Sequence, residues 1–154
     1  MDHFSDMRPG EEAVPLPAAT DAGIYFIGRV RTPWASRAEC PKRGDALSGP
    51  LCRLEIAAPW HAALAGIDRH EHLQVLYWMH LARRDLVRQS PRADGETSGT
   101  FALRSPVRPN PIASAIVRLV TVEAAALVVR GLDCVDGTPL IDIKPERCPH
   151  AMGE

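Results

Sequence analysis

Short apolar runs, separated by residues that favour turns, follow one another along most of this 154-residue sequence. The runs are rich in β-branched and aromatic residues, which is typical of strands. We expect strands at residues 24–30, 51–56, 72–80, 99–103, 112–122, 126–130 and 140–143. Helix-rich alternation between the strands is absent, so the pattern predicts an all-β (mainly β) fold, either a sandwich or a barrel.

One short helix and several long loops account for most of the remaining chain. Pro59–Ile67 is rich in alanine and starts with a proline, which predicts a short helix that ends near Gly66. The dipeptide Asp136-Gly137 is typical of hairpin turns and lies between two of the expected strands. No G-x-G-x-x-G motif follows a strand, so a dinucleotide-binding fold is disfavoured.

The domain organisation follows from composition along the chain. Residues 1–23 mix acids, prolines and small residues without periodicity, which indicates a tail that is flexible or laid along the surface. We expect one β domain, a sandwich or a barrel, over residues 24–148 and a second tail over residues 149–154. The formal net charge is −1, so any contact with nucleic acid is expected to be local.

The cysteines and the hydropathy pattern indicate the cellular compartment of the protein and whether it binds a metal. The four cysteines are Cys40, Cys52, Cys134 and Cys148, and they form no C-x-x-C pair. We therefore expect free thiols and no metal site, since Cys148 with His150 is a weak ligand pair. No signal sequence is visible and no apolar run approaches the ~20 residues of a membrane span, so we expect a cytoplasmic protein without membrane contact.

The densest chemistry lies in two runs of the C-terminal half. Phe101–Ile112 places three prolines, two arginines and an asparagine between apolar stretches. Prolines fix φ and hold the preceding residues out of the helical region, so this run is expected to be a stiff connector that displays Arg104 and Arg108 to an anion or carboxylate. The second run, Gly131–Pro139, is a turn with two carboxylates. We interpret the two runs together as a ligand site.

Both runs resemble the signature of the TsaA-like family, also called the TrmO or YaeB family. The family pattern F-A-T-R-S-P-x-R-P-N-P-I-G corresponds to residues 101–113, and L-D-x-x-D-G-T-P-x-x-D-I-K-P corresponds to residues 132–145. A further match, I-G-x-x-R-[ST]-P, lies at residues 27–33. The sequence departs from the family at Gln74, at Leu103, at Ala113 and throughout residues 89–98.

This resemblance implies a β-barrel that binds S-adenosylmethionine, as a homodimer with the cofactor near the subunit interface. It also implies methylation of the exocyclic nitrogen of threonylcarbamoyladenosine, next to the anticodon of tRNA. The different sequence at residues 89–98 and the short C-terminus leave two alternatives open. One is a methyltransferase for a smaller acceptor, and the other is a module that binds the cofactor without turnover.

The resemblance also implies residue roles. Arg104 corresponds to an arginine that contacts the cofactor, with a surface salt bridge as the alternative. The other residues expected to bind the cofactor are Arg43, Gly44, Asp45, Met79, His80, Ser114, Arg130, Gly131, Leu132 and Asp133. Asp136 is expected to shape its turn. The sulfonium methyl is already a strong electrophile, so orientation can supply much of the rate and no catalytic base is assigned.

Several polar residues have two possible roles. Arg108, Asn110 and Lys144 are expected near the substrate. Asn110 could instead hold its loop through main-chain hydrogen bonds, and Lys144 could pair with Asp142. A cluster of arginines, Arg83, Arg84, Arg88 and Arg92, could bind RNA phosphates or form a solvated charged face.

Overall fold

A computed structural model of the chain describes residues 6–146, and these form two compact units. The barrel unit contains residues 24–78 and 114–146. The second unit contains residues 6–23 and 79–113. The segment 79–113 packs with N-terminal residues in the second unit, and the expected domain over residues 24–148 stays a prediction. The tail expected at residues 149–154 lies outside the described residues.

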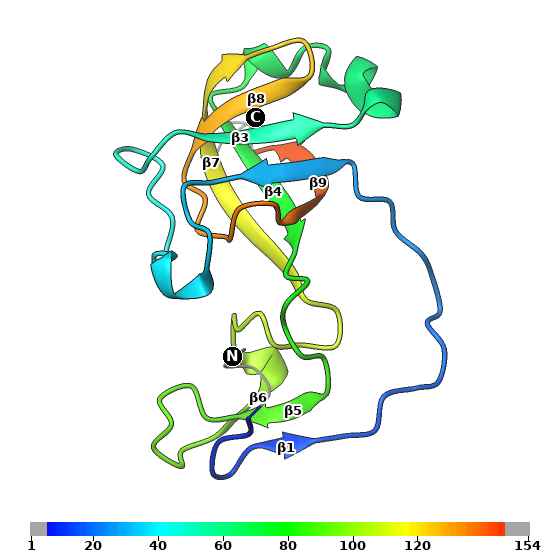
Figure 1. Cartoon of the computed structure of the whole chain (residues 1–154), viewed down its shortest axis with the longest axis vertical. Helices are drawn as coiled ribbons and strands as arrows, with labels where there is room; N and C mark the ends of the chain where they lie inside the picture. Colours follow the sequence, from blue (N-terminus) through cyan, green and yellow to red (C-terminus); the bar gives the residue numbers. More distant parts are fainter. Residues whose placement is uncertain (1–5, 147–154) are drawn as a thin grey trace, which may run out of the picture. The chain divides into compact units, whose positions relative to one another are not determined.

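The barrel unit is a closed antiparallel barrel with the strand order β2-β3-β8-β7-β4-β9 (Figure 1). β2 pairs with both β3 and β9, and β8 pairs with both β3 and β7. The mainly β fold predicted from the sequence and the barrel implied by the family resemblance are both confirmed. Its strands are β2 (Gly28–Arg31), β3 (Cys52–Ile56), β4 (His72–Trp78), β7 (Ile112–Val122), β8 (Ala126–Arg130) and β9 (Pro139–Pro145).

Side chains that alternate along the strands fill the barrel. In β4, the buried Leu73, Val75 and Tyr77 alternate with half-buried residues. The core also contains fully buried aliphatic residues from the other strands, namely Val30, Leu54, Val117, Leu127, Val129 and Leu140. Each aliphatic side chain of this kind contributes about 1.5–3 kcal/mol when it leaves water, so this interior is the main source of stability of the barrel.

The helix expected at residues 59–67 is present as 3-10 turns rather than as an α-helix. They are η2 (Ala58–Leu64) and η3 (Ile67–Arg69), separated by Gly66 in the left-handed region at φ 83°. Hydrogen bonds run from residue i to i−3, as from Trp60 N–H to the carbonyl of Ala57 at 3.0 Å. Across residues 6–146, no helix has the length and apolarity needed to cross a membrane.

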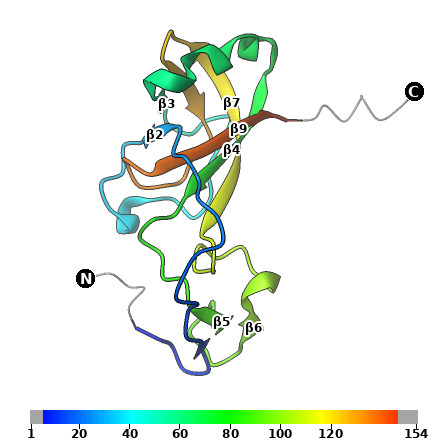
Figure 2. The same ribbon diagram turned by 90° about the vertical axis from the view of Figure 1, so that its right-hand side faces the viewer.

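The second unit contains a three-stranded sheet with the order β1-β5-β6. These strands are β1 (Glu12–Ala13), β5 (Leu86–Gln89) and β6 (Ser98–Gly99), and Figure 2 shows the last two side by side. Part of the expected N-terminal tail is therefore a strand, because β1 pairs with β5. Arg8 adds a hydrogen bond from Nη1 to the carbonyl of Ser90 at 2.8 Å.

Two expectations about local structure were wrong. Residues 99–103 form no strand beyond Gly99, because the chain turns into η4 (Thr100–Ala102), where the buried Thr100 hydroxyl donates to the carbonyl of Leu86 at 2.7 Å. Asp136-Gly137 does form a turn, with Gly137 at φ 83°, but it does not make a hairpin. It leads from β8 to β9, and β9 lies between β2 and β4 in the barrel.

Two buried thiols predict how the stability of this fold depends on pH. Burial raises the pKa of Cys52 to about 11 and the pKa of Cys134 to about 12, whereas the usual value is 9.0. The unfolded chain therefore releases these two protons at a lower pH than the folded chain does. We expect the free energy of unfolding to be steady below about pH 8 and to decrease as the pH rises past about 9.

Urea denaturation followed at several pH values between about 7 and 10 measures this dependence. A double variant, Cys52→Ala with Cys134→Ala, serves as the control. It is expected to be less stable at neutral pH, because two buried side chains are shortened, and to lose less stability on going to alkaline pH. A wild-type protein with constant stability through about pH 10 would contradict the assignment of these pKa values.

Candidate functional site

A loop after β2 packs its backbone directly on the turn that follows β8. A Cβ atom on Gly44 would lie 1.8 Å from the carbonyl oxygen of Gly131 and 3.2 Å from the nitrogen of Leu132, so only glycine fits. Gly131 has φ 118°, and a Cβ atom there would lie 3.0 Å from the carbonyl oxygen of Ile116. Three backbone segments thus meet at these two glycines, and we call this place the glycine junction.

The loop at the glycine junction is held in shape by Asp45 and Arg130. The Asp45 carboxylate accepts hydrogen bonds from the N–H groups of Leu47 and Ser48 at 2.9 and 3.0 Å, and from the Ser48 hydroxyl at 2.7 Å. These bonds, above all the one from the Ser48 hydroxyl, lower the pKa of Asp45. Arg130 Nη1 donates to the carbonyl of Gly49. The structure therefore brings together Gly44, Asp45, Arg130 and Gly131, which the sequence predicted to share a site.

Asp133 follows the glycine junction by two residues and has a fixed orientation. The hydroxyl of the buried Tyr77 donates to its carboxylate at 2.6 Å. The pKa of the Cys40 thiol is raised, mainly by burial and next by the nearby Asp133 carboxylate. Cys40 is a neighbour of the site that the sequence did not indicate, because a lone cysteine in a polar loop carries no pattern. Asp133 retains the capacity to accept further hydrogen bonds.

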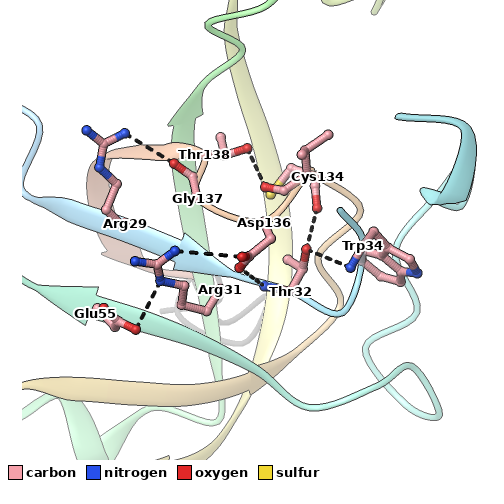
Figure 3. A network of polar contacts seen from close by, with 10 residues as sticks. Arg29, Arg31, Thr32, Trp34, Glu55, Cys134, Asp136, Gly137 and Thr138 are labelled. Atoms are coloured by element: carbon pink, nitrogen blue, oxygen red, sulfur yellow. Dashed lines mark hydrogen bonds and ion pairs between the residues drawn. The ribbon is translucent and has the colours of Figure 1, made fainter. Parts of the chain in front are cut away.

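Asp136 shapes the next turn, as the sequence predicted. Its carboxylate accepts from the N–H of Thr32 at 3.1 Å and lies 3.7 Å from Nη1 of Arg31 (Figure 3). The Thr32 hydroxyl donates to the carbonyl of Cys134 at 2.8 Å, and Arg29 Nη1 donates to the carbonyl of Gly137 at 3.2 Å. The turn is therefore tied to β2, so the segment that carries Asp133 is fixed at both ends.

Two further predicted residues of the barrel unit have local partners. The Ser114 hydroxyl accepts from Nε2 of Gln74 at 3.0 Å. Lys144 Nζ lies 3.0 Å from the Asp142 carboxylate, so the expected pairing of these two residues is confirmed. Leu132 is buried at 2 % exposure, and the preceding Gly131 is buried as well.

The two arginines of the proline-rich connector, both in the second unit, differ in their contacts. Arg108 Nη1 donates to the carbonyls of Leu103 and Ser105 at 3.0 and 3.1 Å, so it braces the connector itself. Buried Gln89 adds a bond from Nε2 to the carbonyl of Val107 at 2.7 Å. Arg104 is exposed, and its guanidinium makes no hydrogen bond or ion pair with the described residues. Arg104 can therefore bind a ligand without losing an existing contact.

The other predicted residues of the second unit surround the same connector. Asn110 Oδ1 accepts from Nη2 of Arg84 at 3.2 Å, so Asn110 helps to hold its loop. Met79 N–H donates to the carbonyl of Pro111 at 2.8 Å, and His80 is exposed. The arginine cluster is also largely engaged, because Arg83 pairs with Asp85 at 2.7 Å and Arg88 donates to Thr97 at 2.8 Å. Whether Arg104, Met79 and His80 bind the same ligand as the glycine junction stays a prediction.

Metal chemistry receives no support from the part of the chain that the structure describes. Within residues 6–146, no group of three or more histidine, cysteine, aspartate or glutamate side chains could hold a metal ion. The weak pair Cys148 and His150 lies outside these residues.

Comparisons with known proteins agree with this arrangement. Residues 29–147 match the family described as the tRNA-methyltransferase O N-terminal domain. A probable S-adenosyl-L-methionine-binding protein, VirR of Rhizobium radiobacter, is 52% identical over 145 residues, which are 94% of this chain and 82% of that protein. The human tRNA (adenine(37)-N6)-methyltransferase is 31% identical over 160 residues, covering 90% of this chain and 36% of the human protein.

Solved structures show the same relationship. A crystal structure of TrmO aligns with a TM-score of 0.69 at 32% sequence identity, and covers 88% of this chain and 61% of the TrmO chain. TrmO from Pseudomonas aeruginosa aligns with a TM-score of 0.68 at 31% identity, with 88% and 60% coverage. The chain therefore spans about three fifths of these structures.

The chain belongs to the tRNA-methyltransferase O N-terminal domain family, whose members include S-adenosylmethionine-dependent methyltransferases. The family, the enzyme class and the cofactor that we expected from the sequence are thus confirmed at the level of the family.

The glycine junction yields a prediction. In a Gly44→Ala variant, the new methyl group would overlap the carbonyl of Gly131, so the loop must move away from β8. We expect the free energy of unfolding to decrease by roughly 1–3 kcal/mol. We also expect trypsin to cleave faster after the exposed Lys42 and Arg43, because the displaced loop opens more often.

Gly23→Ala is the matched control, since a Cβ atom there meets nothing within 4 Å. It should behave as the wild type in both urea denaturation and limited proteolysis. A Gly44→Ala protein that equals this control in both measurements would show that the contact with Gly131 is not needed to hold the loop.

Proposed function

We propose that this chain binds S-adenosylmethionine and methylates the exocyclic nitrogen of threonylcarbamoyladenosine next to the anticodon of tRNA. The observation that carries the proposal is the glycine junction, with Asp133 fixed beside it in a barrel of the TrmO family. The human relative is named as a methyltransferase of adenine 37 in tRNA, which supports the acceptor.

The groups of the site suit the parts of this cofactor. The Asp133 carboxylate, oriented by Tyr77, can accept hydrogen bonds from ribose hydroxyls or from the adenine amino group. The buried Gly131 and Leu132 hold the main chain that leads to Asp133. The free guanidinium of Arg104 can hold the methionine carboxylate through two parallel hydrogen bonds. When bound, the cofactor supplies an electrophilic methyl group, so the main task of the protein is to orient the acceptor.

Within each unit, other residues brace the groups that we propose bind the ligand. Arg108 and Gln89 hold the connector that carries Arg104, and Arg130 holds the loop over β8. A site whose groups are already oriented loses less conformational entropy on binding, which increases affinity.

A homodimer in the cytoplasm is part of the proposal. The chain belongs to the TrmO N-terminal domain family, and the resemblance to that family implies a homodimer with the cofactor near the subunit interface.

A binding module without turnover is the second candidate. Several relatives, among them VirR at 52% identity, carry names that state S-adenosyl-L-methionine binding and no reaction. A methyltransferase for a smaller acceptor is the third possibility that the assay below separates.

Arg104→Ala tests the cofactor site. If Arg104 pairs with the methionine carboxylate in a desolvated site, its removal should weaken S-adenosylmethionine binding by roughly 2–5 kcal/mol, measured by calorimetry. Arg92→Ala, an exposed arginine of the same unit, is the control and should bind as the wild type. Equal affinities for Arg104→Ala and Arg92→Ala would remove Arg104 from the site.

The reaction is tested with labelled S-adenosylmethionine and total RNA from cells that lack the endogenous activity. We expect nucleoside mass spectrometry to find methylated threonylcarbamoyladenosine in the RNA. Label confined to small molecules would support the smaller acceptor instead. Cofactor binding with no transfer to either would support the binding module.

A further inference from the structure

Two arginines stand directly opposite each other on the outer wall of the barrel. Arg118 of β7 and Arg130 of β8 are partners in the antiparallel register. Like charges at opposite positions of neighbouring strands destabilise a sheet. Within residues 6–146 neither arginine makes an ion pair, and Arg118 is exposed. This excess of positive charge therefore has no structural compensation from a carboxylate.

Other arginines of the barrel wall are compensated, which makes this pair distinct. Arg31 and Arg53 are also opposite each other, on β2 and β3. Each has a carboxylate partner, because Arg31 Nε lies 3.1 Å from Glu55 and Arg53 makes two 2.8 Å hydrogen bonds to Glu123. The barrel thus neutralises one pair of facing arginines with carboxylates and not the other, in which Arg118 is exposed and the half-buried Arg130 donates to the carbonyl of Gly49.

Carboxylates of the adjoining segments do not neutralise the pair. Asp45 is occupied by Leu47 and Ser48, and Asp133 accepts from Tyr77. On the other side of β7, the N–H of Leu119 donates to the carbonyl of Glu71, which places Glu71 alongside this part of the strand. No ion pair joins Glu71 to Arg118 among the described residues.

The pair lies beside the glycine junction. Arg130 directly precedes Gly131, and Arg118 lies two residues after Ile116, whose carbonyl touches Gly131. Exposed Lys42 and Arg43 precede Gly44 in the loop that packs there. Cations from three separate segments therefore surround the place where the proposed cofactor site begins.

We propose that Arg118 and the Lys42–Arg43 loop, which Arg130 holds in place, form a phosphate-binding edge that binds the RNA backbone beside the cofactor site. This inference rests on the proposed function, and it assigns a role to Arg118 that the cofactor chemistry does not use. Guanidinium groups suit phosphate because they bind it through two parallel hydrogen bonds. A chain with a net charge of −1 has no global field to attract RNA, so a local edge of this kind is needed.

The test measures binding of a fluorescently labelled anticodon stem-loop RNA by anisotropy over a series of salt concentrations. We expect Arg118→Ala to weaken binding several-fold and to reduce the slope of log affinity against log salt by about 1, the value for one lost phosphate contact. The loss should be the same for a second stem-loop of different sequence, because phosphate contacts carry no sequence information. S-adenosylmethionine affinity, measured by calorimetry, should be unchanged.

Arg69→Ala is the matched control, since it removes the same charge from an exposed position on η3 of the same unit. It should leave the salt slope of the wild type. Arg118→Ala with the same slope and affinity as Arg69→Ala would overturn the phosphate-binding edge, even if the wild type methylates RNA. Binding of RNA that depends on Arg118 but yields no methyl transfer would support the edge and overturn the proposed reaction. A wild type that binds no RNA at low salt would overturn the edge.

Discussion

The contact between Gly44 and Gly131 is the constraint on which the candidate site depends. Without Cβ atoms at these two positions, three backbone segments approach more closely than side chains would allow. The loop from β2 therefore lies on the end of β8, and Leu132 is pressed into the interior. The side chains around the junction, Asp45 and Arg130, bond to the loop itself. The geometry of the site is thus set by backbone packing first, and polar side chains then fix the loop.

The closure of the barrel fixes the other end of the same segment. β9 pairs with both β2 and β4, and the turn before it is tied to β2 through Asp136 and the carbonyl of Gly137. Arg29 and Gly137, which share one of these bonds, are separated by 108 residues in the sequence. Asp133 lies between the glycine junction and this turn, so its position is determined by long-range pairing. Its carboxylate is consequently oriented only when the whole barrel has formed, which couples the site to the global fold.

The sequence predicted those elements in which local pattern and tertiary contacts agree. The bounds of β7 and β8 were predicted correctly, because both strands consist largely of β-branched and aliphatic residues. The strand predicted at residues 99–103 was wrong because the Thr100 hydroxyl donates to the carbonyl of Leu86, a contact that no local pattern reveals. The pairing of Lys144 with Asp142 and the role of Asp136 followed from side-chain chemistry. The residues of the glycine junction were predicted only through the family resemblance. No pattern in the sequence indicated that Cys40 lies near Asp133.

The existing contacts of each arginine distinguish those that stabilise the fold from those that are free to bind a ligand. Arg108 bonds to two carbonyls of its own connector, and Arg53 bonds to Glu123, so each would lose existing contacts on meeting an anion. Arg104 and Arg118 are exposed and have no such contacts among residues 6–146, so their charge is available to a ligand in full. Affinity for an anionic cofactor group or for RNA is therefore expected from arginines of the second kind, and their positions indicate where each ligand is held.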